Sequence, residues 1–328
     1  MEIGILNQIE NNQHNFKLGL FFALTTVVFW GLLPIALKLS VNFIDPVTLT
    51  WFRFFVAFLV SFLLQKLSGN LYQFRHLLKI DWLKLTLAAL FSVGNYVSFV
   101  YALDYLQPGP AQLTFQSAPF FLAFGGMLFF KERLNALQMS CFATLALGML
   151  LFFHPHLDFS NTTSNQLWMG ILIVQFSALS WTSYALLQKS MIKKLSPGNI
   201  LLFIYGAGIV LMIPFSDFSY FAEMTLNQWY ISVFCAINTL IAYGCFAQSM
   251  KYWPTAQVGA TVTLAPVFSF IFTAIVVALG WWPEMIKSNP LDILSLSGIL
   301  LVIGSVIFVQ LMPLLRTRAR GGVRQASS

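Results

Sequence analysis

The segment Lys17–Lys38 reads KLGLFFALTTVVFWGLLPIALK and carries no charged residue between the lysines at its two ends. A helix needs about 20 apolar residues to cross the hydrocarbon core of a bilayer at a rise of 1.5 Å per residue. The segment is long enough and apolar enough to span a membrane once. Its apolar side chains surround the whole helix rather than one face, which indicates a lipid-embedded helix and not the surface helix of a soluble domain.

The whole chain shares the composition of this segment. Of its 328 residues 58% are hydrophobic and only 9% are charged, whereas about 25% are charged in an ordinary soluble domain. Because a soluble protein of this length must cover its surface with polar groups, the composition excludes a soluble enzyme, a disordered chain and a disulfide scaffold. It predicts an all-α, polytopic membrane protein. We expect ten transmembrane helices, at Lys17–Lys38, Pro46–Gln65, Lys84–Leu103, Pro110–Phe130, Leu134–Phe153, Leu167–Gln188, Pro197–Pro214, Gln228–Met250, Thr255–Gly280 and Leu291–Met312.

The charged residues predict the orientation of these helices. If the N-terminus lies inside the cell, the basic residues gather in the inner connectors, whereas the outer connectors carry mainly aspartate and glutamate. This bias is typical of cytoplasmic loops. We therefore expect a multi-pass protein of the cell inner (plasma) membrane, with a cytoplasmic tail over residues 1–16 and a basic cytoplasmic tail over 314–328. The net charge of +7 then needs no nucleic acid as a partner. The basic residues of the inner connectors are Lys66, Arg75, Lys79, Lys84, Lys131, Arg133, Lys193, Lys194 and Lys251.

An internal repeat relates the two halves of the chain. Identical residues recur at one constant offset in the pairs Trp30 and Trp181, Lys38 and Lys189, and Pro46 and Pro197. Each of the two prolines follows a residue suited to cap a helix. We expect one copy over residues 17–160 and a second over 161–313. Because each copy holds five helices, an odd number, the second copy must enter the membrane with the opposite orientation. Such 5+5 inverted repeats are a recurrent transporter architecture with a substrate site near the midplane.

The same stretches resemble a known family. FWGLLPIALK (Phe29–Lys38) is similar to the Trp-Gly opening of the EamA-type ten-helix transporters of the drug/metabolite transporter superfamily. AQLTFQSAPFFLAFGGMLFFKERL (Ala111–Leu134) resembles their proline-containing helix that ends in Gly-Glu-Arg-Leu, with Lys131 where glycine is usual. The matching stretches of the second half, LSWTSYALLQK (Leu179–Lys189) and TLAPVFSFIFTAIVVALGWWPE (Thr263–Glu284), are similar but looser. The resemblance implies a carrier of amino acids or other small metabolites, with a central cavity between the first, third, fourth, sixth, eighth and ninth helices.

Polar and aromatic residues inside these helices are candidates for lining that cavity. Gln112 and Gln116 share one stripe of the fourth helix with Pro119, and their carboxamides must avoid lipid; an interhelical hydrogen bond is the structural alternative. Tryptophans in mid-span are not interfacial anchors, so Trp30 and Trp181 either pack internally or contact solute. The expected substrate-binding residues are Trp30, Asn95, Tyr96, Gln112, Gln116, Trp181, Tyr184, Tyr243 and Thr263.

Two prolines and two cations each have two possible roles. Pro119 and Pro266 are expected well inside their helices, where each frees a backbone carbonyl and either bends the helix statically or lets half of it move during gating. Arg53 either snorkels or pairs near the membrane surface, or it attracts an anionic group of the solute. Lys38 either snorkels at the end of its helix or guards the mouth of the cavity.

Groups that drive catalysis or coupled transport are missing from the expected spans. No aspartate or glutamate lies in the middle third of any span, and the chain contains no P-loop motif. A membrane-embedded enzyme needs converging acids, bases or metal ligands, so we expect no enzyme, no cofactor and no metal site. We expect export of amino acids or related compounds by alternating access. An anionic or nucleotide-like solute is the alternative. A monomer is sufficient to form one transport pathway, and the sequence is equally compatible with a dimer.

Overall fold

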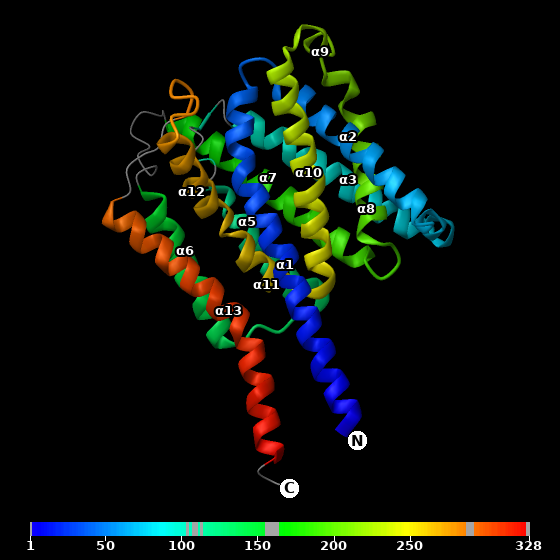
Figure 1. Ribbon diagram of the computed structural model, residues 1–328, viewed down its shortest axis with the longest axis vertical. Coiled ribbons are helices and arrows are strands. Elements are labelled where there is room, and N and C mark those ends of the chain that lie inside the picture. The colour runs from blue at the N-terminus through cyan, green and yellow to red at the C-terminus, as the bar shows by residue number, and fades with distance from the viewer. Residues whose placement is uncertain are drawn as a thin grey trace.

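The computed structural model describes residues 2–102, 105–106, 111, 114–154, 164–286 and 292–325. Within these ranges the chain is helical and contains no strand (Figure 1). The helices are α1 (Glu2–Ser40), α2 (Pro46–Leu67), η1 (Asn70–His76), α3 (Lys79–Ala102), α5 (Ser117–Phe130), α6 (Ala136–Phe152), α7 (Ser164–Met191), α8 (Pro197–Met212), η3 (Ile213–Phe215), α9 (Tyr220–Glu223), α10 (Leu226–Tyr252), α11 (Thr255–Val262), α12 (Ala265–Ala278) and α13 (Ile293–Gln325).

Eight helical segments in the described part of the chain are long and apolar enough to cross a membrane. They coincide with eight of the ten expected spans, because α11 and α12 together form the single segment Thr255–Ala278. The two other expected spans fall on the shorter apolar helices α5 and α6. Part of the expected fourth span, before α5, lies outside the described residues. The all-α membrane architecture is thus confirmed, and within the described residues α5 and α6 are shorter than the eight full-length segments.

The capped prolines of the repeat begin equivalent helices. Asp45 accepts hydrogen bonds from the amides of Val47 and Thr48 at 2.9 and 3.0 Å and caps α2, which starts at Pro46. Ser196 caps α8, which starts at Pro197. A capping side chain contributes about 1 kcal/mol to helix stability, and proline at the first helical position loses no hydrogen bond. Both helices therefore begin where the sequence predicts.

The other two prolines lie nearer a helix start than expected. Pro119 is in the first turn of α5, and Pro266 is in the first turn of α12. Amides of the first turn have no acceptor within their helix, so proline there removes no helical hydrogen bond. The expectation that both prolines lie well inside helices is wrong. In the second half the ninth span is interrupted around Thr263 and Leu264, between α11 and α12.

The helices pair reciprocally between the two halves. Helix α1 packs along α10 and α12, and its counterpart α7 packs along α3 and α5. Likewise α10 contacts α2 while α3 contacts α8, and the related helices α2 and α8, α5 and α11, and α6 and α13 pack on each other. Exchanging the halves leaves this pattern unchanged, as a two-fold relation between them requires. The main interfaces therefore join one half to the other.

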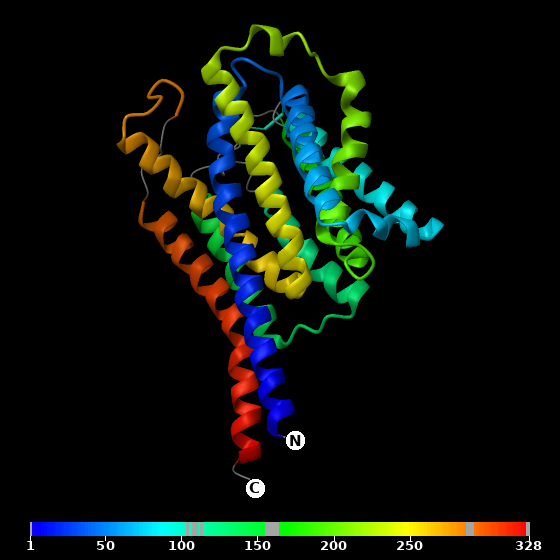
Figure 2. The ribbon, with the colours of Figure 1, turned by 45° about the vertical axis from the view of Figure 1, so that its right-hand side comes forward.

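Figure 2 shows both chain ends at the same end of the molecule. We call this the terminal side. The connectors from α5 to α6, from α7 to α8 and from α10 to α11 face the terminal side, whereas the connector from α1 to α2 and the short helix α9 lie at the opposite end (Figures 1 and 2). Most of the basic connectors thus share one side with both termini.

A close contact of glycines joins α6 to α13 at the edge of the bundle. A Cβ atom added to Gly298 would lie 2.6 Å from the carbonyl oxygen of Gly148, and one added to Gly148 would lie 3.0 Å from the carbonyl oxygen of Gly298. Only glycines let two helix backbones approach this closely. At the end of the pair His154 Nε2 lies 2.9 Å from Asp292 Oδ2. The amide of Ser295 donates to the Asp292 carboxyl and, with His154, holds its pKa below the usual value.

Candidate functional site

Aromatic rings from both halves meet in the middle of the bundle. The ring centroids of Trp30 on α1 and Trp181 on α7 are 6.0 Å apart, in an edge-to-face arrangement. Phe246 on α10 contacts both rings at 5.4 and 5.3 Å, and Tyr243 contacts Trp30 at 5.4 Å. Such contacts are typical of packed aromatic clusters. The repeat-related tryptophans therefore touch each other in the middle of the bundle.

Tyrosines extend this cluster toward a buried arginine. The ring centroid of Tyr243 lies 6.0 Å from that of Tyr96 and 6.3 Å from that of Tyr184. The Cζ atom of Arg53 lies 5.4 Å from the centre of the Tyr96 ring, within the range of a cation–π contact. Arg53 is 2% exposed, so its side chain points into the bundle and does not snorkel to the membrane surface. We call Trp30, Arg53, Tyr96, Trp181, Tyr184 and Tyr243 the aromatic centre.

Several polar atoms of this region have no partner. Arg53 Nε donates a hydrogen bond to Thr239 Oγ1 at 2.7 Å, but Arg53 Nη2 has no partner in the described part of the chain. The buried hydroxyls of Tyr184 and Tyr205 also lack partners there. A buried polar group without a hydrogen bond costs about 1–3 kcal/mol. Such groups are therefore expected where a second molecule supplies the missing bonds.

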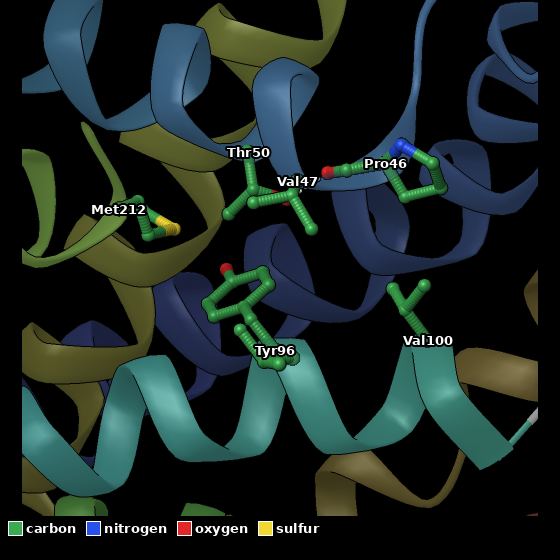
Figure 3. A pocket seen from close by; sticks show the side chains of 7 residues that line it. Pro46, Val47, Thr50, Tyr96, Val100 and Met212 are labelled. Carbon is green, nitrogen blue, oxygen red and sulfur yellow. Dashed lines mark hydrogen bonds between the residues drawn. The ribbon is translucent and has the colours of Figure 1, made fainter. Parts of the chain in front are cut away.

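A crevice lies beside the aromatic centre, toward the end opposite the termini. It is a narrow indentation between α2, α3 and α8, too tight in this arrangement to hold a solute. Figure 3 shows Tyr96 rising from α3 into this crevice, with its hydroxyl directed toward Thr50 and Met212. Tyr96 thus belongs to the crevice wall and to the aromatic centre. The residues that line the crevice are Pro46, Val47, Thr50, Tyr96, Val97, Val100 and Met212.

An ion pair closes the terminal side of the bundle. Lys189 Nζ at the end of α7 lies 2.7 Å from Glu132 Oε1 and donates to the carbonyl of Trp253 at 3.2 Å. Glu132 also accepts a hydrogen bond from the amide of Thr255, the first residue of α11, at 2.9 Å. A carboxylate in this position complements the positive end of the helix dipole. We call Glu132, Lys189, Trp253 and Thr255 the latch, which joins α5, α7, α10 and α11.

The equivalent residues of the other half make no such pair. Lys38 corresponds to Lys189 in the repeat, and Glu284 is the late acidic residue of the second copy. Both side chains are exposed, and neither forms an ion pair with another described residue. The two ends of the bundle therefore differ in their charged contacts. Lys38 also lies apart from the aromatic centre, so of the two candidate cations only Arg53 is placed inside.

The remaining candidates, Asn95, Gln112, Gln116 and Thr263, are not part of the aromatic centre. Asn95 donates to Ser177 Oγ at 2.8 Å and receives a hydrogen bond from it, which clamps α3 to α7. The Thr263 hydroxyl donates to the carbonyl of Ala260 at 2.6 Å. Gln116 is half-buried in the turn before α5, and Gln112 lies outside the described residues. Both Asn95 and Thr263 therefore make structural hydrogen bonds, Asn95 between two helices and Thr263 within its own helical turn.

Comparison with known proteins bears on the class of this site. The sequence model of the EamA-like transporter family matches residues 17–154 and again residues 168–311. The chain belongs to the EamA-like transporter family. A Haemophilus influenzae protein named "Uncharacterized transporter" is 31% identical over 79% of this chain and 84% of its own length. The Escherichia coli K12 "Uncharacterized inner membrane transporter YhbE" is 28% identical over 89% of this chain and 90% of its own.

Two more distant likenesses complete the comparison. A Salmonella typhimurium "Probable amino-acid metabolite efflux pump" is 22% identical over 78% of this chain and 85% of its own length. Among the solved structures that match, one crystal structure has a TM-score of 0.70 at 17% identity, over 90% of this chain and 97% of that one. At this identity the likeness concerns the fold alone. As a member of the EamA-like family the chain is a membrane transporter.

The EamA-type motif at the end of α5 accounts for two neighbouring residues, Lys131 and Glu132. Lys131, where the family motif has glycine, ends α5 with φ 55°, a left-handed conformation that glycine adopts without strain. Glu132 follows Lys131 in that motif. It was not among the candidate residues, although its place in the motif could have identified it. Tyr205 and Thr239 were also missed, and their mid-span polarity in α8 and α10 was the signal.

Proposed function

We propose that the chain exports small metabolites, amino acids or related compounds, across the cell inner membrane by alternating access. The observation that carries this proposal is the aromatic centre, which is built from helices of both halves and contains buried hydroxyls without partners. Aromatic faces and a few polar groups suit small zwitterionic solutes with apolar parts. The Salmonella relative named an amino-acid metabolite efflux pump supports the solute class.

The two ends of the bundle suggest how access alternates. In this structure the latch ties the terminal side, while the crevice approaches Tyr96 from the opposite side. The reciprocal packing of the halves lets the second arrangement mirror the first, with the terminal side open and the opposite end closed. The contact between Trp30 and Trp181 separates the two sides, so their rings must part when a solute enters.

Efflux measurements test the proposal. In cells preloaded with radiolabelled amino acids, the wild-type chain should lower the retained label, and Trp181→Ala should reduce the initial efflux rate about tenfold or more. Trp181 is buried in the centre, and its loss removes an aromatic face and leaves a cavity. Trp168→Ala is the matched control, because Trp168 lies on the same helix and is 63% exposed. The solute class fails if no amino acid or related metabolite moves.

The orientation of the chain in the membrane has its own test. We expect epitope tags at both termini to resist protease added to intact cells and to become cleavable once the cells are opened. The reason is the gathering of basic connectors on the terminal side, which favours a cytoplasmic location for that side. A tag in the connector that contains α9 should be cleaved in intact cells. Cleavage of either terminal tag before the cells are opened would refute this orientation.

An anionic or nucleotide-like solute remains the second candidate because Arg53 is buried in the centre. Within the described residues Arg53 is the one basic side chain that is buried. A nucleotide-like metabolite carries several negative charges, whereas one guanidinium compensates about one. The geometry therefore favours a solute with a single negative group. If nucleotide-like compounds inhibit efflux and amino acids do not, the nucleotide-like solute becomes the first candidate.

A further inference from the structure

We propose that Arg53 is the receptor for a carboxylate group of the transported solute. This inference rests on the proposed function and adds the chemical group that the aromatic centre recognises. The site consists of the free Nη2 side of the Arg53 guanidinium, the ring of Tyr96 that faces it and the mouth of the crevice beside Tyr96. The solutes are compounds with one free carboxylate and an apolar or aromatic remainder.

The first step of the argument concerns the energetics of Arg53. A charged side chain inside a membrane bundle is costly and is normally paired or functional. Arg53 forms no ion pair with any described residue, and Thr239 is the one hydrogen-bond partner found for its Nε. The described acidic residue that is buried, Asp81, is already bound to Lys194 at 2.7 Å. No described residue therefore neutralises the charge of Arg53. The anion that pairs with it comes from outside the described part of the chain.

The second step concerns geometry. The hydrogen bond to Thr239 and the cation–π contact with Tyr96 restrain the guanidinium before a ligand arrives. An oriented guanidinium binds planar carboxylates better than a flexible ammonium does. Tyr205, whose hydroxyl is buried and unpartnered, packs on Phe54 at 5.3 Å, and Phe54 packs on Tyr96 at 5.2 Å. A further hydrogen-bond donor thus lies in the same cluster.

The third step concerns access. Tyr96 lines the crevice near the end opposite the termini. The guanidinium of Arg53 lies over the ring of the same Tyr96. A carboxylate that enters when α2, α3 and α8 move apart meets Tyr96 first and Arg53 next, without passing the tryptophan pair. The apolar side chains of Val47, Val97 and Val100 line this crevice and face the remainder of the solute once the helices have moved apart. One cation limits recognition to one carboxylate and disfavours compounds with several phosphates.

Binding to the detergent-purified full chain tests this assignment. Thermal shifts are recorded with two matched pairs of probes, L-phenylalanine against L-phenylalaninamide and benzoate against benzamide, since a ligand of the native state raises the unfolding temperature. In the wild type the acid should act at about tenfold lower concentration than its amide, the difference expected of a charge-assisted hydrogen bond. In Arg53→Gln that ratio should fall to about one.

Two further variants keep the test decisive. Arg53→Lys retains the charge but lacks the planar fork, so it should lose most of the preference even if Arg53→Gln does not fold. Lys38→Gln removes an exposed cation of the neighbouring helix and should leave the ratio unchanged. The assignment is overturned if a folded Arg53 variant keeps the wild-type ratio. It is also overturned if the wild type binds acid and amide equally, or binds neither acid.

The outcomes separate this inference from the proposed function. If the wild type exports L-phenylalanine while Arg53→Gln keeps the preference for the acid, the carboxylate site is wrong and transport stands. If benzoate binding depends on Arg53 but no amino acid binds or moves, the carboxylate site stands and amino-acid export is wrong.

Discussion

Replacing Glu132 by alanine is expected to lower the free energy of unfolding by about 3 kcal/mol and to loosen the terminal side of the bundle. Glu132 and Lys189 have side chains that are only 16% and 15% exposed, so the variant leaves a shielded ammonium group without its partner. It also removes the carboxylate that accepts the hydrogen bond from the amide of Thr255 at the start of α11. Thermal unfolding in detergent measures the loss of stability.

Local opening gives a second readout of the same change. Backbone amides of α11 should exchange with deuterium faster in Glu132→Ala, because the latch holds the first turn of this helix, whereas α6 and α13 should be unaffected. The double variant Glu132→Ala/Lys189→Met should recover part of the stability, since it buries no unpaired charge. Glu284→Ala, at an exposed position, should change stability by less than about 0.5 kcal/mol. Equal exchange of α11 in Glu132→Ala and wild type would rule out the latch.

Replacing Gly298 by valine is expected to separate α13 from α6 and to destabilise the protein by about 3 kcal/mol or more. The added Cβ would collide with the backbone of Gly148 and of Phe152, and backbone atoms cannot rotate aside as a flexible side chain can. Overpacking of a close contact usually costs about 1–3 kcal/mol, and the interface here has no side chain to yield. The yield of monodisperse protein and the midpoint of thermal unfolding measure the effect.

Another glycine of α13 provides the matched control. A Cβ on Gly304 meets no atom within 4 Å, so Gly304→Val adds the same side chain to the same helix without a collision. We expect its midpoint to stay within about 2 °C of the wild type. If Gly298→Val and Gly304→Val behaved alike, the effect would come from valine in a helix and not from the contact of α13 with α6.

Hydropathy and charge sufficed to predict where helices occur, because the cost of unpaired backbone groups in lipid permits little else. They did not predict how each helix is rotated about its axis. In helices that are apolar all round, no polar face marks the inside, so Arg53 could equally have reached the membrane surface. The structure turns Arg53 inward, at 2% exposure, and leaves Lys38 exposed. Only the packing of α2 against α10 and α8 decides this.

Only part of the candidate site was predicted from the sequence, because contacts between distant residues depend on how the helices pack. The repeat identified Trp30 and Trp181 as equivalent, and equivalent residues near a two-fold axis can meet, as these rings do at 6.0 Å. Whether such residues touch each other or stand apart is something that no pattern of residues along the chain reveals. Glu132 was missed because its role is to cap α11, a helix that starts far along the chain at Thr255. Such a contact depends on tertiary structure alone.

The reciprocal pairing of helices has a consequence for biosynthesis. The main contacts of α1 are with α10 and α12, and those of α3 are with α7 and α8, all of which are made later by the ribosome. When the first five helices have entered the bilayer, their future interfaces still face lipid or one another. The nascent first half therefore waits as a loose intermediate, and the protein acquires its final shape only after nearly all of the chain has been translated.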